Sequence, residues 1–156
     1  MSDTLNELYR DIVMDHFKYP RGKKVIEHPD ATSEGQNPVC GDEIHVTLKI
    51  NADVVEDIGV DCAGCAISVA SGSMLADIIK GKTLAEVKKI AATIRALLKG
   101  EKPPYEIELG DLEALGGVRK FPVRVKCALL AWTTLIDSIE SLEQGQMKKE
   151  KVSTTE

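Results

Sequence analysis

A thiol and a carboxylate stand two residues apart where an alternating sequence begins, in the stretch Cys40-Gly41-Asp42. In an extended chain, side chains two residues apart point to the same side, and Gly41 between them lets the backbone bend. The pair therefore forms one half of a predicted metal site, which needs further donors from distant segments. The remaining cysteines of the chain are Cys62, Cys65 and Cys127.

Length and charge limit the class of protein. The 156 residues suit one domain with a single core, which we predict over residues 1–144, followed by a disordered, polar tail over 145–156. The net charge of −5 lacks the basic excess of nucleic-acid binders, and no apolar run approaches the ~20 residues of a membrane span. Without a signal-peptide pattern, we expect a cytoplasmic protein with no nucleic-acid or membrane partner. In that compartment four cysteines favour metal binding or catalysis over disulfides.

Hydrophobic periodicity predicts both strands and helices. Alternation predicts strands over 44–51 and 54–61, paired as an antiparallel hairpin. Residues 23–39 show no clear period and are expected to be a loop with short extended pieces. Helical spacing and capping signals predict helices over 4–16, 66–80, 83–98 and 122–143, with a short helix over 111–115.

The cysteines lie where these elements begin and end. Cys40 and Asp42 extend the apolar face of the first strand, whereas Cys65 and Cys127 fall at predicted helix starts. A helix N-terminus carries about half a positive charge, which stabilises a thiolate. Three thiolates and one carboxylate would suit Zn²⁺, which takes four S, N or O donors tetrahedrally. The other interpretation is that the cysteines are buried as small hydrophobic side chains.

Three motifs resemble those of the IscU-type iron–sulfur cluster assembly family, which is NifU N-terminal-like. They are Cys40-Gly41-Asp42, Gly64-Cys65-Ala66-Ile67-Ser68 and Arg124-Val125-Lys126-Cys127-Ala128, and the likeness covers about residues 4–142. Two features indicate the SufU branch of this family. Lys126 stands where IscU has a histidine directly before its last cysteine, and the segment 109–115 is similar to the SufU insertion.

The resemblance implies an α+β fold of the SufE/NifU-like, IscU type, in which a small antiparallel sheet of about three strands packs against helices. It implies zinc held by Cys40, Asp42, Cys65 and Cys127. It also implies a zinc-dependent sulfurtransferase-type acceptor, rather than a stand-alone enzyme, that takes persulfide sulfur from a SufS-type cysteine desulfurase. Downstream iron–sulfur assembly proteins would then receive the sulfur.

Two site residues are expected to take part in the transfer. Cys40 is the predicted sulfur acceptor, because it lies in a Gly-containing loop where rotation is easiest and because the resemblance places this role on the CGD cysteine. Arg124 is expected near the metal as a partner for Asp42 when that carboxylate is released.

Three other functions fit parts of the sequence. A scaffold on which a [2Fe–2S] cluster is assembled would use the same three cysteines, but Lys126 leaves it without a fourth conventional ligand. A thiol–disulfide oxidoreductase using Cys62 and Cys65 lacks the thioredoxin-like βαβ context. The serines of the 66–80 helix show no paired histidine, which argues against a serine hydrolase.

Cys62 is a departure from the SufU pattern. Since Asp42 already completes four ligands, we expect Cys62 to be a strand-end thiol packed near the core. If Cys62 did bind metal, Asp42 would be the ligand displaced.

Overall fold

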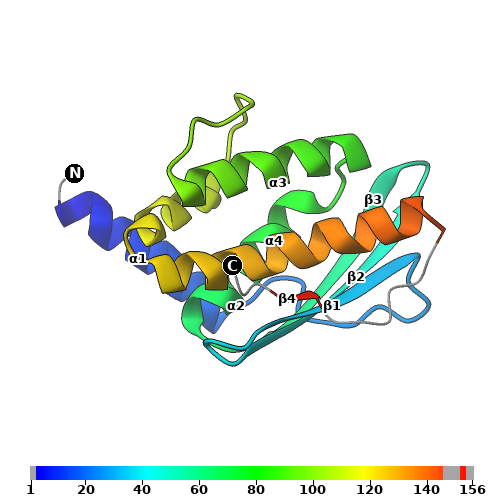
Figure 1. Ribbon diagram of the computed structural model, residues 1–156, viewed down its shortest axis with the longest axis horizontal. Coiled ribbons are helices and arrows are strands. Elements are labelled where there is room, and N and C mark those ends of the chain that lie inside the picture. The colour runs from blue at the N-terminus through cyan, green and yellow to red at the C-terminus, as the bar shows by residue number, and fades with distance from the viewer. Residues whose placement is uncertain (1–2, 146–151, 154–156) are drawn as a thin grey trace.

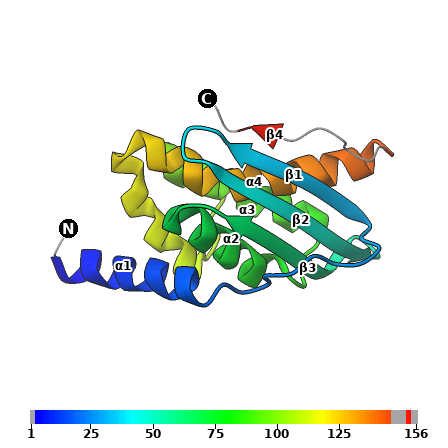
Figure 2. The ribbon, with the colours of Figure 1, turned by 90° about the horizontal axis from the view of Figure 1, so that it is seen from below.

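A sheet lies at the base of the molecule, and helices cover one of its faces (Figures 1 and 2). The computed structural model of the chain describes residues 3–145 and 152–153. The helices are α1 (Asp3–Lys18), α2 (Ala66–Ile79), α3 (Leu84–Lys99), the 3₁₀-helical segment η1 (Gly110–Lys120) and α4 (Pro122–Glu143). The strands are β1 (Ala31–Asn37), β2 (Asp42–Asn51), β3 (Val54–Ala63) and the two-residue β4 (Val152–Ser153).

The predicted hairpin is present, and a third antiparallel strand adjoins it. The sheet order is β3-β2-β1-β4, with β1, β2 and β3 antiparallel and β4 parallel to β1. The register sets Val46 opposite Val60 and Leu48 opposite Ile58, so that both strands direct apolar side chains toward the helices. The α+β fold with a small antiparallel sheet is thus confirmed.

Strand β1 lies in a segment where a loop was expected, and its composition explains the error. Its inward residues are small or polar, and Gly35 among them faces α4 so closely that a Cβ would overlap Thr134 Oγ1. Ser33 Oγ donates a hydrogen bond to Asp137 Oδ2 at 2.6 Å. The strand is therefore buried by the close approach of a helix, and it carries no alternation of large apolar residues.

Two helices lie directly on the sheet, and a third packs outside one of them. Helix α2 packs on β3, α4 crosses β1 and β2, and α3 packs outside α4 (Figure 1). The capping box predicted for α3 is present between Thr83 and Glu86. Fully buried side chains between the layers include Leu48, Leu75, Ile94, Leu130 and Leu135. Over the part of the chain that is described, no helix is both long and apolar enough to cross a membrane.

The segment before α4 differs from its expected length. The short helix expected over 111–115 is an eleven-residue 3₁₀ segment that leads directly into α4, and Pro122 occupies the first turn of α4 as predicted. The tail predicted over 145–156 lies largely outside the described residues, apart from Gly145 and the strand β4.

Candidate metal centre

Cys40 lies at the tip of the hairpin that joins β1 to β2. Asn37 and Asp42 pair across the two strands, and the Asn37 carbonyl accepts hydrogen bonds from Cys40 N at 3.3 Å and Gly41 N at 2.9 Å. Gly41 adopts φ +73°, which a residue with a side chain rarely does. The predicted bend at Gly41 is confirmed, and it leaves Cys40 half-buried on a tight loop.

Asp42 is held by the N-terminus of α2. Cys65 is the N-cap of that helix, and its backbone N–H donates to Asp42 Oδ1 at 2.8 Å. Ser68 Oγ donates to Asp42 Oδ2 at 2.6 Å. These two hydrogen bonds orient the carboxylate. A negative charge is favoured at a helix N-terminus, which offsets the cost of burying Asp42, which is only 1% exposed. Gly64 makes room for it, since a Cβ at that position would overlap Asp42.

Cys127 lies further along its helix than expected. It is five residues after Pro122, where α4 begins, so the prediction of a helix-start cysteine is confirmed for Cys65 and wrong for Cys127. The helix dipole acts mainly within the first turn. Burial instead raises the pKa of the Cys127 thiol, and contacts with Cys40, Cys65 and Asp42 raise it further.

Three residues of the predicted ligand set come together at one point, and the fourth, Cys65, lies beside one of them. Donor atoms of Cys40, Asp42 and Cys127 all lie within 4.8 Å of one another, and Cys65 Sγ is 3.8 Å from Asp42 Oδ2. Cys127 Sγ is 3.1 Å from Cys40 Sγ. Three thiols and a carboxylate crowded in this way repel one another when ionised, and a cation removes that repulsion. The donor set fits Zn²⁺, which prefers four ligands of this kind.

Arg124 faces the thiols from the exposed start of α4. A hydrogen bond to Cys127, together with the negative charge of Cys65, raises the pKa of its guanidinium. The hydrogen bonds of Asp42 described here go to Cys65 and Ser68. The pairing of Arg124 with a released Asp42 therefore stays a prediction.

Cys62 is a core residue, as expected from the sequence. It is 8% exposed and lies opposite Ile44 in the strand pair. Burial raises the pKa of its thiol to about 12, with the charges of Asp42 and Cys65 adding to the effect. Among the described residues, the group of donors that could hold a metal ion does not include it.

Two buried residues beside the donors were not predicted from the sequence. Asn37 Nδ2 donates to Cys127 Sγ at 3.5 Å, and Ser68 contacts both Asp42 and the Cys127 carbonyl. Asn37 is three residues before Cys40, and Ser68 is three residues after Cys65. The signal for each was a polar residue next to a ligand motif, which is where partners of ligand side chains are expected.

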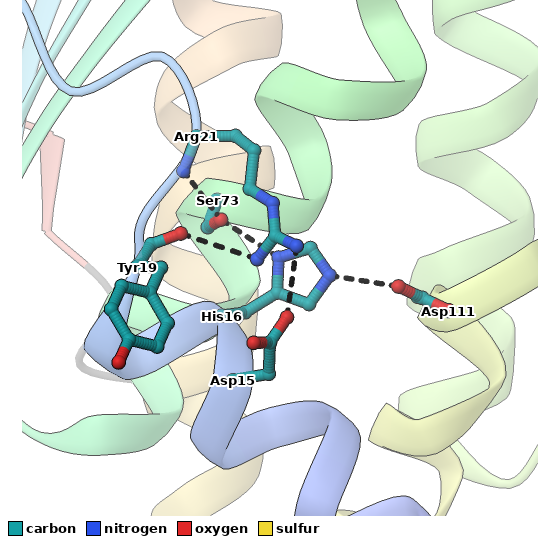
Figure 3. Close-up of polar contacts among 6 residues, drawn as sticks. All are labelled: Asp15, His16, Tyr19, Arg21, Ser73 and Asp111. Carbon is teal, nitrogen blue, oxygen red and sulfur yellow. Dashed lines mark hydrogen bonds and ion pairs between the residues drawn. The ribbon is translucent and has the colours of Figure 1, made fainter.

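A serine of α2 does have a histidine partner, contrary to the sequence-based expectation. His16 Nδ1 forms a hydrogen bond of 2.7 Å with Ser73 Oγ, and His16 Nε2 forms one of 2.9 Å with Asp111 Oδ2 (Figure 3). Ser73 Oγ also accepts from Arg21 N at 2.8 Å. Both His16 and Ser73 are at least 98% buried, so the serine is closed to substrate. The cluster joins α1, α2 and η1, and gives no hydrolase site.

Comparison with known proteins identifies the relatives of the chain. The NifU-like N terminal domain matches residues 8–128. The zinc-dependent sulfurtransferase SufU of Bacillus subtilis is 41% identical over 146 residues, which cover 94% of each chain. The iron–sulfur cluster assembly scaffold protein IscU of Streptococcus pyogenes is 39% identical over 142 residues, 91% of this chain and 89% of the relative. A solved structure from Fervidobacterium islandicum, put forward as the scaffold protein of a SUF system, superposes with TM-score 0.78 and 30% identity, covering 83% and 94% of the two chains.

Proposed function

The chain belongs to the family of the NifU-like N-terminal domain, and we propose that it is a zinc-dependent acceptor of persulfide sulfur from a cysteine desulfurase. A relative at 39% identity is named as an iron–sulfur cluster assembly scaffold protein. The observation that carries the proposal is the convergence of Cys40, Asp42 and Cys127, with Cys65 beside them. The 41% identity to a zinc-dependent sulfurtransferase supports the choice of metal and reaction.

Cys40, Asp42, Cys65 and Cys127 would hold the zinc, which keeps its thiol ligands deprotonated at neutral pH. The protein residues differ in how firmly they are fixed. Cys127 is fully buried in α4, and Cys65 caps α2. Cys40 is half-buried on a hairpin tip. Because loop residues reorient more easily than residues within helices, Cys40 is the thiolate best placed to meet a partner protein.

The transfer is a thiolate exchange without net oxidation. The Cys40 thiolate attacks the outer sulfur of the persulfide on the desulfurase. The S–S bond of the desulfurase breaks, its cysteine leaves with the electron pair, and a new S–S bond joins the outer sulfur to Cys40. We assign Arg124 to hold the carboxylate of Asp42 when Asp42 leaves Cys65 and Ser68.

The experiment is desulfurase turnover with and without the protein, followed by mass mapping of the added sulfur. We expect faster alanine production in its presence and one added sulfur on Cys40. The Cys40→Ser variant should give no stimulation, and Cys62→Ser should behave as the wild type. Sulfur on Cys65, Cys127 or Cys62 with Cys40 unmodified would contradict the assignment.

A [2Fe–2S] scaffold is the second candidate, because a relative at 39% identity carries that name. Lys126, directly before Cys127, leaves this candidate without the histidine of IscU. Metal analysis after purification without oxygen separates the two functions. Colourless protein with zinc supports the sulfur acceptor, and brown protein with iron and sulfide supports the scaffold.

A further inference from the structure

Asn37 is a fully buried residue that spans the two halves of the metal centre. Its Nδ2 donates to Cys127 Sγ at 3.5 Å, and its Oδ1 accepts from Val39 N at 3.3 Å. Its backbone carbonyl accepts from Cys40 N and Gly41 N. One residue therefore fixes the loop of Cys40 and the thiol of Cys127 relative to each other.

The two thiols that Asn37 holds near each other, those of Cys40 and Cys127, are close enough to react. Cys127 Sγ is 3.1 Å from Cys40 Sγ. Once Cys40 carries a persulfide, the Cys127 thiolate has a target: the inner sulfur. That attack forms a Cys40–Cys127 disulfide and breaks the bond to the outer sulfur, which leaves with the electron pair as hydrosulfide. The two thiols are oxidised, the outer sulfur is reduced, and the sulfur is lost to solution.

We propose that Asn37 is a positioning residue that protects the persulfide on Cys40 from attack by Cys127. The proposal rests on the proposed function, since it concerns the fate of the transferred sulfur. A donor N–H on a thiolate engages a sulfur lone pair, and hydrogen bonds to charged acceptors are the strong ones. The lone pair that would attack Cys40 is thereby occupied, and Cys127 acts as an anchor.

Two substitutions remove the donor and otherwise differ. Asn37→Asp has the same shape and keeps an acceptor for the Val39 N–H, but it adds a charge. Asn37→Leu has a similar volume and no charge, but it lacks that acceptor. Their common effect is the loss of the hydrogen bond to Cys127. The matched control is Ser33→Ala, which removes the hydrogen bond from a buried serine elsewhere on β1 to Asp137.

The first measurement is the stability of the persulfide. Zinc-loaded protein is charged with sulfur by the desulfurase, separated from it and from cysteine, and kept without reductant. We expect hydrosulfide release to be about tenfold faster in both Asn37 variants than in the wild type, as for the loss of a hydrogen bond to a charged group. The Cys40–Cys127 disulfide should form in equal amount. Ser33→Ala should retain its sulfur like the wild type.

The second measurement does not depend on transfer. In Co²⁺-substituted protein, losing a hydrogen bond on a thiolate should shift the sulfur-to-cobalt charge-transfer band to lower energy in the Asn37 variants and not in Ser33→Ala.

The outcomes separate this proposal from the proposed function. Wild-type protein that takes no sulfur on Cys40 contradicts the proposed function. Wild-type protein that holds sulfur, with metal-loaded Asn37 variants that hold it equally long, overturns the role of Asn37 alone. Faster release in loaded Asn37→Leu but not in loaded Asn37→Asp overturns it too, because the contact with Val39 would then be responsible. Loss of metal from both variants, with Ser33→Ala still loaded, would give Asn37 a structural role instead.

Discussion

At the scale of single residues, buried polar groups contact the donors of the proposed metal centre. Ser68 is 1% exposed, and its hydroxyl contacts Asp42 Oδ2 at 2.6 Å and the Cys127 carbonyl at 3.2 Å. Such a group restricts the orientation of the carboxylate before any metal binds. Mutation of partners of this kind typically lowers metal affinity about 10- to 100-fold.

We therefore expect Ser68→Ala to lower zinc affinity about 10- to 100-fold, measured by competition with a chromophoric chelator. Ser71→Ala is the matched control, because Ser71 is equally buried on α2 and its hydroxyl donates to the Ala128 carbonyl instead. Without metal, both variants should lose about 1 kcal/mol of unfolding free energy, and only Ser68→Ala should bind zinc more weakly. Equal zinc affinities in the two variants would show that Ser68 does not contribute to zinc binding.

Cys62→Ser should keep its full zinc content, because Cys62 packs in the core and the proposed set of Cys40, Asp42, Cys65 and Cys127 already supplies four ligands. The substitution should instead change the response to alkaline pH. The folded protein raises the pKa of this thiol from 9.0 to about 12, so the unfolded chain loses the proton first as the pH rises. The contribution of this thiol to the free energy of unfolding is fully present below pH 9.0. It is lost between pH 9.0 and 12, by up to ~1.4 kcal/mol per pH unit.

The measurement for Cys62 is urea denaturation at several pH values above 8, with zinc content determined in parallel. The variant should lose stability less steeply than the wild type, since serine does not ionise in this range. Identical slopes would show that the thiol is not protected by burial, and zinc loss would show that this chain uses Cys62 as a ligand.

At the scale of elements, prediction succeeded where burial depends on side-chain period and failed where it depends on close packing. The strands 42–51 and 54–63 were predicted over 44–51 and 54–61 from their alternation. Helices α1 and α4 were located from apolar residues at helical spacing, and α2 and α3 from small residues and capping signals. Strand β1 lacks that period because α4 approaches Gly35 too closely for side chains there. Cys127 was placed at a helix start because Pro122 suggested the right boundary, but not how far into the helix the thiol lies.

Gly35→Ala should therefore separate α4 from the sheet. A Cβ at this position overlaps Thr134 Oγ1 and comes within 3.1 Å of Leu130 Cδ1. Overpacking of this kind destabilises a core by about 1–3 kcal/mol, and chemical denaturation would measure it. Adding Thr134→Ala, which removes the overlapping hydroxyl, should restore part of the loss.

Gly117→Ala is the control for that experiment, because nothing lies within 4 Å of the added Cβ. Its stability should stay within about 0.5 kcal/mol of the wild type. If Gly35→Ala and Gly117→Ala were equally stable, β1 and α4 would not be in close contact at Gly35.

At the scale of the whole molecule, the proposed metal centre joins three parts of the fold. The hairpin tip supplies Cys40 and Asp42, α2 supplies Cys65, and α4 supplies Cys127. The sequence indicated these donors through their motifs. Asn37 and Ser68 stand next to these motifs, but their contacts with Cys127 and Asp42 arise only when the three segments meet. A site built in this way exists only in the folded chain, so metal binding and folding are coupled.

Removing the metal should then destabilise the entire domain. We expect one tightly bound zinc per chain, and a ligand present at about a thousandfold above its Kd stabilises the folded state by about 4 kcal/mol. For a chain of this size that free energy corresponds to a fall in Tm of about 8–16 °C on chelation, measured by calorimetry with metal analysis. Cys65→Ser and Cys127→Ser should be purified without zinc, should melt near the chelated wild type, and should not respond to chelator. Cys62→Ser, whose thiol is outside the donor group, should show the full decrease. Zinc retained by both ligand variants, or a wild-type Tm unchanged by complete removal of zinc, would show that these three segments do not form a metal centre coupled to folding.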